Sequence, residues 1–414
     1  MKQKMKTFEN KVEEYAKLVI KVGINIQQGQ TLVISASIAA ADFVRRICRY
    51  AYLNGAHFVY IKWIDEELAR IEYELMSEQG LEYTPDWLVK GYEEMASDGA
   101  AFLYIISPHL QNMEGIDPIK TEKAEYASAI AFRSFTKKLT SMQVSWTVIA
   151  YPTEKWAESI FPYMVPKEGL EQLWEEFFKI MKLDAENPIA AWEQHIEGLN
   201  KRAALLNDER FRYLHFISEG TDLKIELPNN HHWLNGLETN DNGTPFICNM
   251  PTEEIYTTPL KTGVNGIVKN TKPLVYEGHV IDDFTLTFKY GKIVDCSAKK
   301  GLDALKGILS MDEGAKYIGE VALVPHDSVI SASNLLFYHT LFDENASCHL
   351  AIGHGYISGL KEGNRVDREN SINSSIIHVD FMIGSEYLQV NGVREDGTVE
   401  PILIDGKWAA KFLN

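Results

Sequence analysis

Cysteine is scarce in this chain of 414 residues: only Cys48, Cys248, Cys296 and Cys348 occur, and no two of them form a CxxC pair. Four scattered thiols exclude a disulfide framework and favour a reducing compartment, so we expect the cytoplasm. The sequence also lacks a run of about 18 apolar residues, the length that spans a bilayer. We therefore expect no membrane partner.

Basic residues are the minority among the charged ones, with 41 Lys and Arg against 58 Asp and Glu, a net charge of −17 with His neutral. Binding to a phosphate backbone needs basic patches, so we expect no nucleic-acid partner. Neither a GxGxxG placed between a strand and a helix nor a GxxxxGK[ST] loop occurs. The content of 45% hydrophobic and 24% charged residues is typical of a globular protein with ample core, and the length suggests two to three domains.

The first half of the chain alternates helical patterns with continuous apolar runs. These runs, which we interpret as buried strands, are residues 31–35, 58–63, 101–106 and 146–150. Continuous apolar strands separated by helices indicate a parallel sheet covered on both faces. Residues 167–206 then show a helical pattern throughout. We predict an α/β N-terminal domain with a mostly parallel sheet over residues 1–208.

The pattern changes near residue 208. Residues 223–227 and 284–288 alternate between apolar and polar, and the second stretch reaches Tyr290-Gly291-Lys292 and returns, a hairpin signal. Asn-Gly turns separate these pieces. We predict an α+β, β-rich C-terminal domain over residues 209–414, with a predominantly antiparallel sheet.

The most informative motif of this second half is His378-Val379-Asp380, flanked by apolar residues. In a strand, residues two apart point to the same face, so the imidazole and the carboxylate would emerge side by side. A buried carboxylate is costly unless it is paired or metal-bound, and a divalent ion accepts both ligand types. The alternative is a hydrogen-bonded His–Asp pair within a core.

Further acids lie in otherwise apolar surroundings. Glu320 interrupts the apolar run 318–325, and Glu253 and Glu254 follow a Pro turn. Glu344 and His349 are five residues apart, which is poor spacing for one helix or strand face, although a junction between a loop and an element can aim both at one point. Each acid alone could be solvated or cap a helix. Their joint occurrence with histidines favours a metal site.

These stretches resemble the family of aminopeptidases T, S and II, which are dinuclear metalloaminopeptidases. The resemblance covers the whole chain, and its motifs are KVGINIQQGQ at 21–30, YPTEKWA at 151–157, MPTEE at 250–254, GEVA at 319–322, LFDENA at 341–346 followed by His349, and HVDFMIG at 378–384.

The resemblance implies a metal-dependent aminopeptidase with the ligand set Glu254, Glu320, Glu344, His349, His378 and Asp380. Glu253 could supply the first carboxylate instead, but the 66-residue separation between Glu254 and Glu320 is the one expected of the family. Tyr356, seven residues after His349, matches the active-site tyrosine of this family. The resemblance also implies two divalent metal ions, a homodimer, and peptide substrates with a free N-terminus. Mixed nitrogen and oxygen ligation suits Zn²⁺ or Co²⁺.

Under this hypothesis a metal-activated water attacks the first peptide bond, with Glu320 or Glu254 as a bridging ligand and a nearby carboxylate as general base. Tyr356 could donate to the developing oxyanion or approach a metal directly. One alternative is a dinuclear hydrolase of another substrate class, such as a phosphoesterase, although phosphate usually calls for Arg or Lys near the metals. Another is a non-enzymatic small-ligand binding protein.

The remaining histidines have other expected roles. His339 lies on a helical pattern, where it would pack or cap, whereas residues 231–233 (HHW) look like an exposed loop. His354 stands between two glycines near Tyr356 and could line a cleft.

Overall fold

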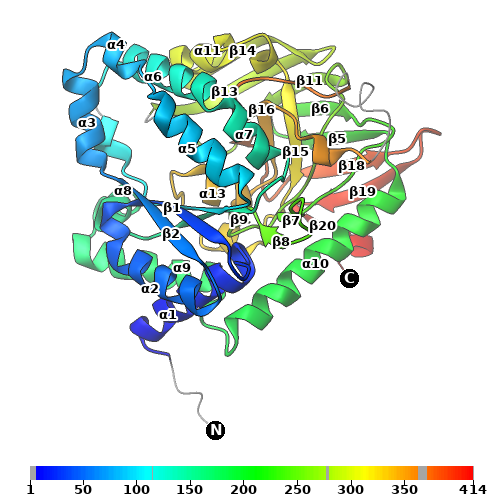
Figure 1. The fold of residues 1–414 in the computed structure, drawn as a ribbon. Helices are drawn as coiled ribbons and strands as arrows, with labels where there is room; N and C mark the ends of the chain where they lie inside the picture. Colours follow the sequence, from blue (N-terminus) through cyan, green and yellow to red (C-terminus); the bar gives the residue numbers. More distant parts are fainter. Residues whose placement is uncertain (1–5, 114, 277–278, 362–370, 414) are drawn as a thin grey trace. The chain divides into compact units, whose positions relative to one another are not determined.

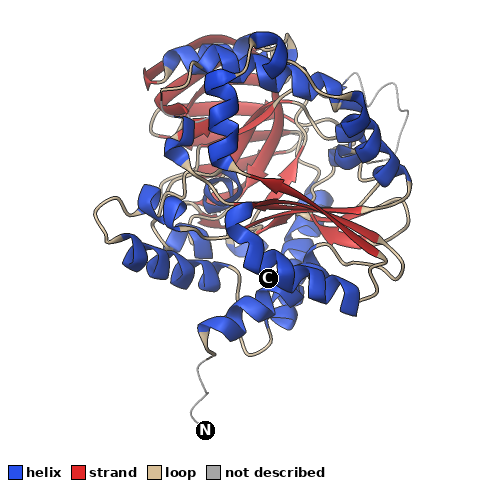
Figure 2. Cartoon of the chain, turned by 60° about the vertical axis from the view of Figure 1, so that its left-hand side comes forward, coloured by secondary structure: helices blue, strands red, loops and turns tan. Residues whose placement is uncertain are grey.

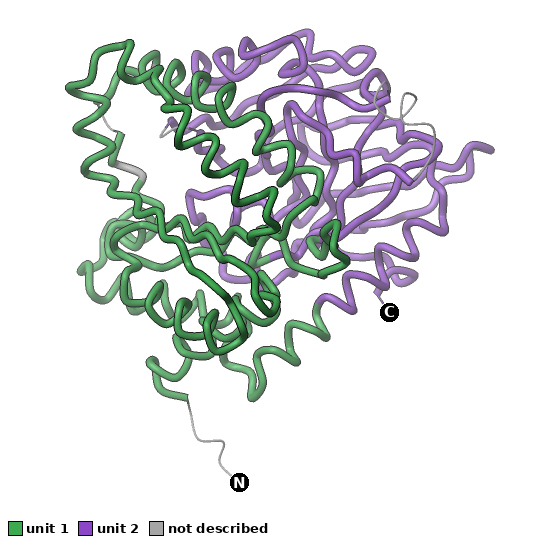
Figure 3. The backbone as a smooth tube through the Cα atoms, viewed as in Figure 1, with its two compact units in different colours: residues 1–195, 236–251 green, residues 196–235, 252–414 purple. Residues whose placement is uncertain are grey.

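A computed structural model describes residues 6–113, 115–276, 279–361 and 371–413. The chain forms two compact units, residues 1–195 with 236–251 and residues 196–235 with 252–414 (Figure 3). The units are interleaved along the sequence, because the chain passes from one to the other after His195, after Asn235 and after Pro251. A single cut at residue 208 therefore does not reproduce them.

The first unit contains the predicted parallel sheet (Figure 1). Its strand order is β2-β1-β3-β4-β9, and every neighbouring pair is parallel. Four strands match the apolar runs of the sequence, and β9 is an addition that the sequence did not indicate. The bounds are β1 (Thr31–Ser37), β2 (Phe58–Ile64), β3 (Ala101–Ile106), β4 (Trp146–Ala150) and β9 (Asn249–Met250).

Helices connect these strands. They are α1 (Phe8–Leu18), α2 (Ala41–Leu53), α3 (Glu66–Leu75), α4 (Glu78–Leu81), α5 (Asp86–Ser97), α6 (Pro118–Ala131), α7 (Arg133–Thr140), α8 (Glu154–Ile160), α9 (Pro166–Ile180) and α10 (Pro188–Glu209). The helical stretch expected over 167–206 is divided into α9 and α10. Lys182 adopts a positive φ of 57° after α9, and Pro188 starts the next helix at a position that needs no backbone donor.

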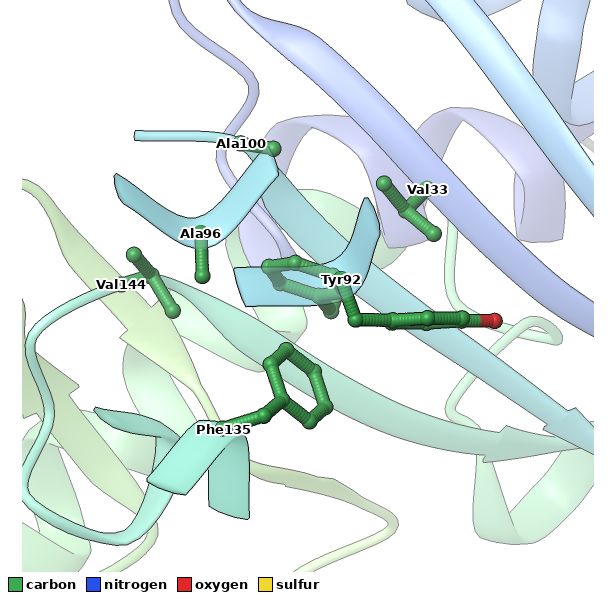
Figure 4. Packing of buried hydrophobic residues seen from close by; sticks show 7 residues of the cluster. Val33, Tyr92, Ala96, Ala100, Phe135 and Val144 are labelled. Carbon is green, nitrogen blue, oxygen red and sulfur yellow. The ribbon is translucent and has the colours of Figure 1, made fainter. Parts of the chain in front are cut away.

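Apolar side chains cover both faces of the central strands. On one face, α5 and α7 pack on β1 and β3 through a buried cluster in which the Phe135 and Phe102 rings lie 5.0 Å apart (Figure 4). On the other face, Tyr15 of α1 stacks on Phe43 of α2 at 4.7 Å and donates its hydroxyl to the Ala150 carbonyl at 2.8 Å. The cluster in Figure 4 comprises Val33, Tyr92, Ala96, Ala100, Phe102, Phe135 and Val144.

Strand β2 differs from expectation because it is not buried. Phe58 is 52% exposed and Trp63 is 43% exposed. The reason is topological: β2 lies at the edge of the sheet and pairs only with β1. A continuous apolar run was therefore not enough to identify a central strand.

The second unit is built on antiparallel sheets, as predicted (Figure 2). In the described residues, one sheet has the order β10-β15-β16-β17, and a larger one has the order β12-β13-β11-β6-β5-β18-β19-β20, with β14 beside β13. The larger sheet comprises β5 (Tyr213–Ser218), β6 (Thr221–Glu226), β11 (Val264–Lys269), β12 (Leu274–Tyr276), β13 (His279–Lys289), β14 (Lys292–Lys300), β18 (Gln389–Val393), β19 (Val399–Ile404) and β20 (Lys407–Trp408).

The smaller sheet comprises β10 (Ile255–Thr257), β15 (Ile318–Leu323), β16 (His349–Gly353) and β17 (His378–Met382). A further pair, β7 (Leu237–Thr239) with β8 (Pro245–Ile247), belongs to the first unit. The helices of the second unit after α10 are α11 (Leu302–Ser310), α12 (Val329–Ala332) and α13 (Thr340–Asp343), with 3₁₀ turns η5 (Glu344–Ala346) and η6 (Ile357–Gly359) near the smaller sheet.

The predicted hairpin is confirmed. Strands β13 and β14 pair antiparallel, and Tyr290 and Gly291 between them both have positive φ, as a tight hairpin turn requires. Within the described ranges, no helix combines the length and the apolar character that crossing a membrane requires.

Candidate metal centre

The smaller antiparallel sheet separates polar from apolar side chains by its two-residue period. One face carries Glu320 of β15, His349 of β16, and His378 and Asp380 of β17; the intervening residues, such as Val321, Leu350, Val379 and Phe381, are buried and apolar. The register aligns Glu320 with Ala351, and Ala351 with Asp380. Because the residue between Glu320 and Asp380 in this register is the small Ala351, the two carboxylates have room to approach each other.

Glu254 and Glu344 enter from the ends of elements. Glu254 directly precedes β10, which pairs with β15. Glu344 begins the 3₁₀ turn η5, and the His349 Nδ1 lies 3.0 Å from the Glu344 carbonyl oxygen and 3.1 Å from that of Ser347. The five-residue spacing thus runs from a turn to the first residue of a strand. This is the junction between a loop and an element that, from the sequence, could point both side chains to one place.

Five of the six candidate ligands form two groups that share one carboxylate. Glu254, Glu320 and His349 make the first group, and Glu320, His378 and Asp380 make the second; within each, one ligand atom per residue lies within 4.8 Å of the others. His349 Nε2 is 3.0 Å from a Glu254 oxygen and 3.6 Å from a Glu320 oxygen. His378 Nε2 is 3.6 Å from the other Glu320 oxygen and 3.5 Å from Asp380 Oδ1.

Hydrogen bonds on the far side of each ring orient the two imidazoles. The Nδ1 of His349 lies at backbone carbonyls, and the Nδ1 of His378 lies 2.8 Å from the carbonyl oxygen of His354. A carbonyl accepts only, so each Nδ1 carries the proton and donates. In its neutral form each ring directs the lone pair of its Nε2 towards the carboxylates, the arrangement typical of metal-bound histidine.

Two polar atoms of the site are buried without a hydrogen-bond partner: His349 Nε2 and Asp380 Oδ1. Glu254 is 3.0 Å from that nitrogen, but the contact does not have hydrogen-bond geometry. Buried polar atoms without partners are costly, and a nitrogen lone pair beside carboxylate oxygens is a donor set that a divalent cation satisfies. The residues therefore fit a metal ion.

The electrostatics show a buried excess of negative charge. Burial, together with nearby acids, raises the pKa of Glu320 and holds the pKa of Glu344 well above its usual range. Burial opposes protonation of His349 and His378, but their carboxylate neighbours outweigh it and raise both pKa values, that of His378 to about 9. Burial also opposes ionisation of Asp380, yet His378 lowers its pKa overall. A bound cation would relieve this excess.

Glu344 belongs to the same cluster although it is in neither three-residue group. Burial raises its pKa and the charges of Asp380 and Glu254 add to this effect; its carboxylate also accepts a hydrogen bond from Asn345, whose amide oxygen accepts from the Glu253 N–H. The structure thus brings all six candidate ligands into one region of the second unit.

Tyr356 lies beside this region. Its ring centroid is 4.8 Å from that of His378 and 5.9 Å from that of His354, and its carbonyl accepts a hydrogen bond from the Thr258 hydroxyl at 2.7 Å. His354 is half-buried and contributes its backbone oxygen to His378. The sequence suggested that His354 could line a cleft; in the structure its main-chain carbonyl orients His378.

Two expectations for other histidines have different outcomes. His339 is the N-cap of α13, where its side chain accepts from the Leu341 N–H, so the capping interpretation is confirmed. The exposed loop expected at residues 231–233 is wrong: His231 and Trp233 are buried, with His231 Nδ1 at the Pro228 carbonyl. Asn345, a buried neighbour of Glu344, was missed, since only its place within the LFDENA motif pointed to it.

Comparison with known proteins identifies relatives along the whole chain. A family model described as thermophilic metalloprotease (M29) matches residues 8–408. Aminopeptidase AmpS of Bacillus subtilis is 44% identical over 98% of this chain and 100% of its own length, and aminopeptidase 2 of Geobacillus stearothermophilus is 42% identical over 98% and 99%. The solved structure of wild-type AmpT from Thermus thermophilus has a TM-score of 0.91 at 38% identity, covering 98% of this chain and 100% of that one.

These names favour peptide hydrolysis over the phosphoesterase and ligand-binding alternatives. The chain belongs to the thermophilic metalloprotease family M29 and is a metal-dependent aminopeptidase.

Proposed function

We propose that this aminopeptidase holds two divalent ions, Zn²⁺ or Co²⁺, between the two groups of ligands, with Glu320 bridging them. The ligands are Glu254, Glu320, Glu344, His349, His378 and Asp380. The observation that carries the proposal is that both three-residue groups contain Glu320, whose two oxygens face different histidines. Four ionised carboxylates and two neutral imidazoles would balance the charge of two divalent ions.

The bound ions would activate a water molecule and polarise the scissile carbonyl. The chain's own groups do the rest. With Nε2 bound to an ion, His349 and His378 would keep one proton each on Nδ1, hydrogen-bonded to backbone carbonyls, and would be neutral ligands. The Tyr356 hydroxyl is proposed to donate a hydrogen bond to the developing oxyanion. A free α-amine in its neutral form offers a lone pair that a bound ion would accept, whereas the amide nitrogen of an N-acetylated end does not, so the site would select peptides with a free N-terminus.

The test combines metal analysis with matched substrates. Exhaustive chelation should abolish hydrolysis of unblocked peptides, Zn²⁺ or Co²⁺ should restore it, and N-acetylated peptides should resist cleavage. Elemental analysis should find about two ions per chain. His378→Ala should lower kcat at least about 10²-fold, whereas His215→Ala, at a surface pair with Asp222, should not. Full activity after chelation would contradict the proposal.

We also propose that the enzyme is a cytoplasmic homodimer. Helix α3 supports the proposal of a dimer because it presents apolar side chains for association. None of its residues is buried, and Leu68, Ile71 and Leu75, at helical spacing, are 52%, 49% and 79% exposed. Light scattering behind a sizing column should give twice the chain mass of 47.0 kDa. A monomer at micromolar concentration would contradict this assignment.

A further inference from the structure

We propose that Asn345 is a positioning residue of the metal centre, which orients the Glu344 carboxylate and ties it to the chain segment of Glu254 through the two ends of one amide. The inference rests on the proposed function, because it takes Glu254 and Glu344 as metal ligands.

Every polar atom of the Asn345 side chain is engaged. Its Nδ2 donates to a Glu344 carboxylate oxygen at 3.3 Å and to the Leu341 carbonyl at 2.9 Å. Its Oδ1 accepts from the Glu253 N–H at 2.7 Å, a contact between residues 92 apart in sequence. The side chain is wholly buried, so water does not compete for these bonds. One planar group therefore links two segments that each deliver a carboxylate.

The chemistry of the amide explains why this position needs asparagine. A backbone N–H can only meet the amide oxygen, and a backbone carbonyl can only meet the NH₂ group, so the contacts to Glu253 and Leu341 fix the orientation of the amide. The remaining N–H then points at Glu344 and restricts the directions its carboxylate can take. Groups that orient a ligand in this way typically change metal affinity or activity 10–100-fold when they are removed.

Asn270 provides a matched control in the same unit. It is also buried, its Oδ1 accepts from the Phe284 N–H at 2.6 Å, and its Nδ2 donates to the Lys272 carbonyl at 2.8 Å. It likewise uses both ends of its amide, reaching Phe284 14 residues away and donating to Asp282 Oδ1 at 3.4 Å, but it contacts none of the six candidate ligands in any described hydrogen bond. Replacing it reports the stability cost of such a link alone.

The experiment compares Asn345→Asp and Asn345→Ala with Asn270→Asp and Asn270→Ala in the full-length protein. The Zn²⁺ dissociation constant is measured by competition with a chromophoric chelator, and the Co²⁺ absorption spectrum reports ligand geometry. Circular dichroism verifies folding. We expect both Asn345 variants to weaken Zn²⁺ binding by about 10–100-fold and to alter the Co²⁺ spectrum. Aspartate retains the acceptor for Glu253 but loses the Nδ2 donor to both Leu341 and Glu344 and adds a negative charge beside Glu344, so it tests the donor end of the amide.

The two Asn270 variants should lower the Tm and leave both metal readouts at wild-type values. The inference is overturned if the Asn345 variants bind Zn²⁺ like wild type, or if both positions weaken it equally. If alanine at position 345 prevents folding, Asn345→Ser and the aspartate variant give the same comparison. A wild-type chain that binds no divalent ion would refute the proposed function itself, whereas wild-type affinity in the Asn345 variants of a chain that does bind divalent ions would refute only the role of Asn345.

Discussion

Glu320→Gln should weaken metal binding and, at the same time, stabilise the metal-free protein. Glu320 is the residue common to both ligand groups, and it is buried within a cluster of acids. Glutamine has nearly the same shape but no charge. Removing one partner of a buried charge pair costs about 3–5 kcal/mol, which at 1.36 kcal/mol per tenfold step corresponds to a rise of roughly 10²- to 10⁴-fold in the metal dissociation constant.

The opposite effect in the metal-free state follows from the sign of the pKa shift. Burial, Asp380 and Glu254 raise the pKa of Glu320 above its value in the unfolded chain. An acid with a raised pKa in the folded state favours folding at low pH and opposes it as the pH rises above the unfolded value. At neutral pH the glutamine variant lacks this penalty, so its metal-free form should have a higher Tm than the metal-free wild type.

The assay measures Zn²⁺ affinity by chelator competition and the Tm of chelated samples by calorimetry. Glu313→Gln is the control, since Glu313 is an exposed acid paired with Lys292 and Lys316, seven residues before Glu320. It should leave the metal affinity unchanged. An unchanged affinity in Glu320→Gln would show that Glu320 is not a shared ligand. A lower Tm of its chelated form would refute the reasoning about charge repulsion.

Further substitutions test single features of the site and its sheet. Tyr356→Phe should lower kcat by about 10²- to 10³-fold with an unchanged metal content, measured by steady-state kinetics and elemental analysis, if its hydroxyl stabilises an oxyanion. His339→Asn keeps a helix cap but does not titrate. Because burial lowers the pKa of His339 to about 4, the wild type should lose stability as the pH falls from 6.5 to 4, and the variant should not. Urea unfolding of chelated samples should show a difference of up to about 3 kcal/mol in the free energy of unfolding. Gly319→Ala should cost about 1–3 kcal/mol, since a Cβ there would collide with the His354 carbonyl, whereas Gly91→Ala, with open space in α5, should not destabilise.

Much of the fold was predictable because local patterns decide it. The runs at 101–106 and 146–150 coincide with β3 and β4, and the alternation before Tyr290 marks the hairpin of β13 and β14. What failed depends on position in the tertiary structure. The pattern of β2 does not reveal that it lies at an edge, and a strand of two residues such as β9 has no periodicity to detect.

The candidate site was predictable to a different degree. The pair His378 and Asp380 follows from strand geometry alone, and the structure places both on β17. The approach of Glu254 to His349 could not be derived from spacing, because it depends on how β10 and β16 both pair with β15. Only the resemblance to a family supplied the set. The orienting groups are backbone carbonyls and one asparagine, which carry no signal of their own in a single sequence.

The interleaved course of the chain restricts how this enzyme can be recombined with its relatives. Exchanging the ligand-bearing unit between two homologues requires junctions after His195, Asn235 and Pro251, and the last lies only three residues before Glu254. A fragment beginning at residue 209 would retain all six candidate ligands, yet its β9 would lack the β4 strand with which it pairs. Chimeras with one crossover should therefore fold less readily than chimeras that transfer residues 236–251 together with the rest of the first unit.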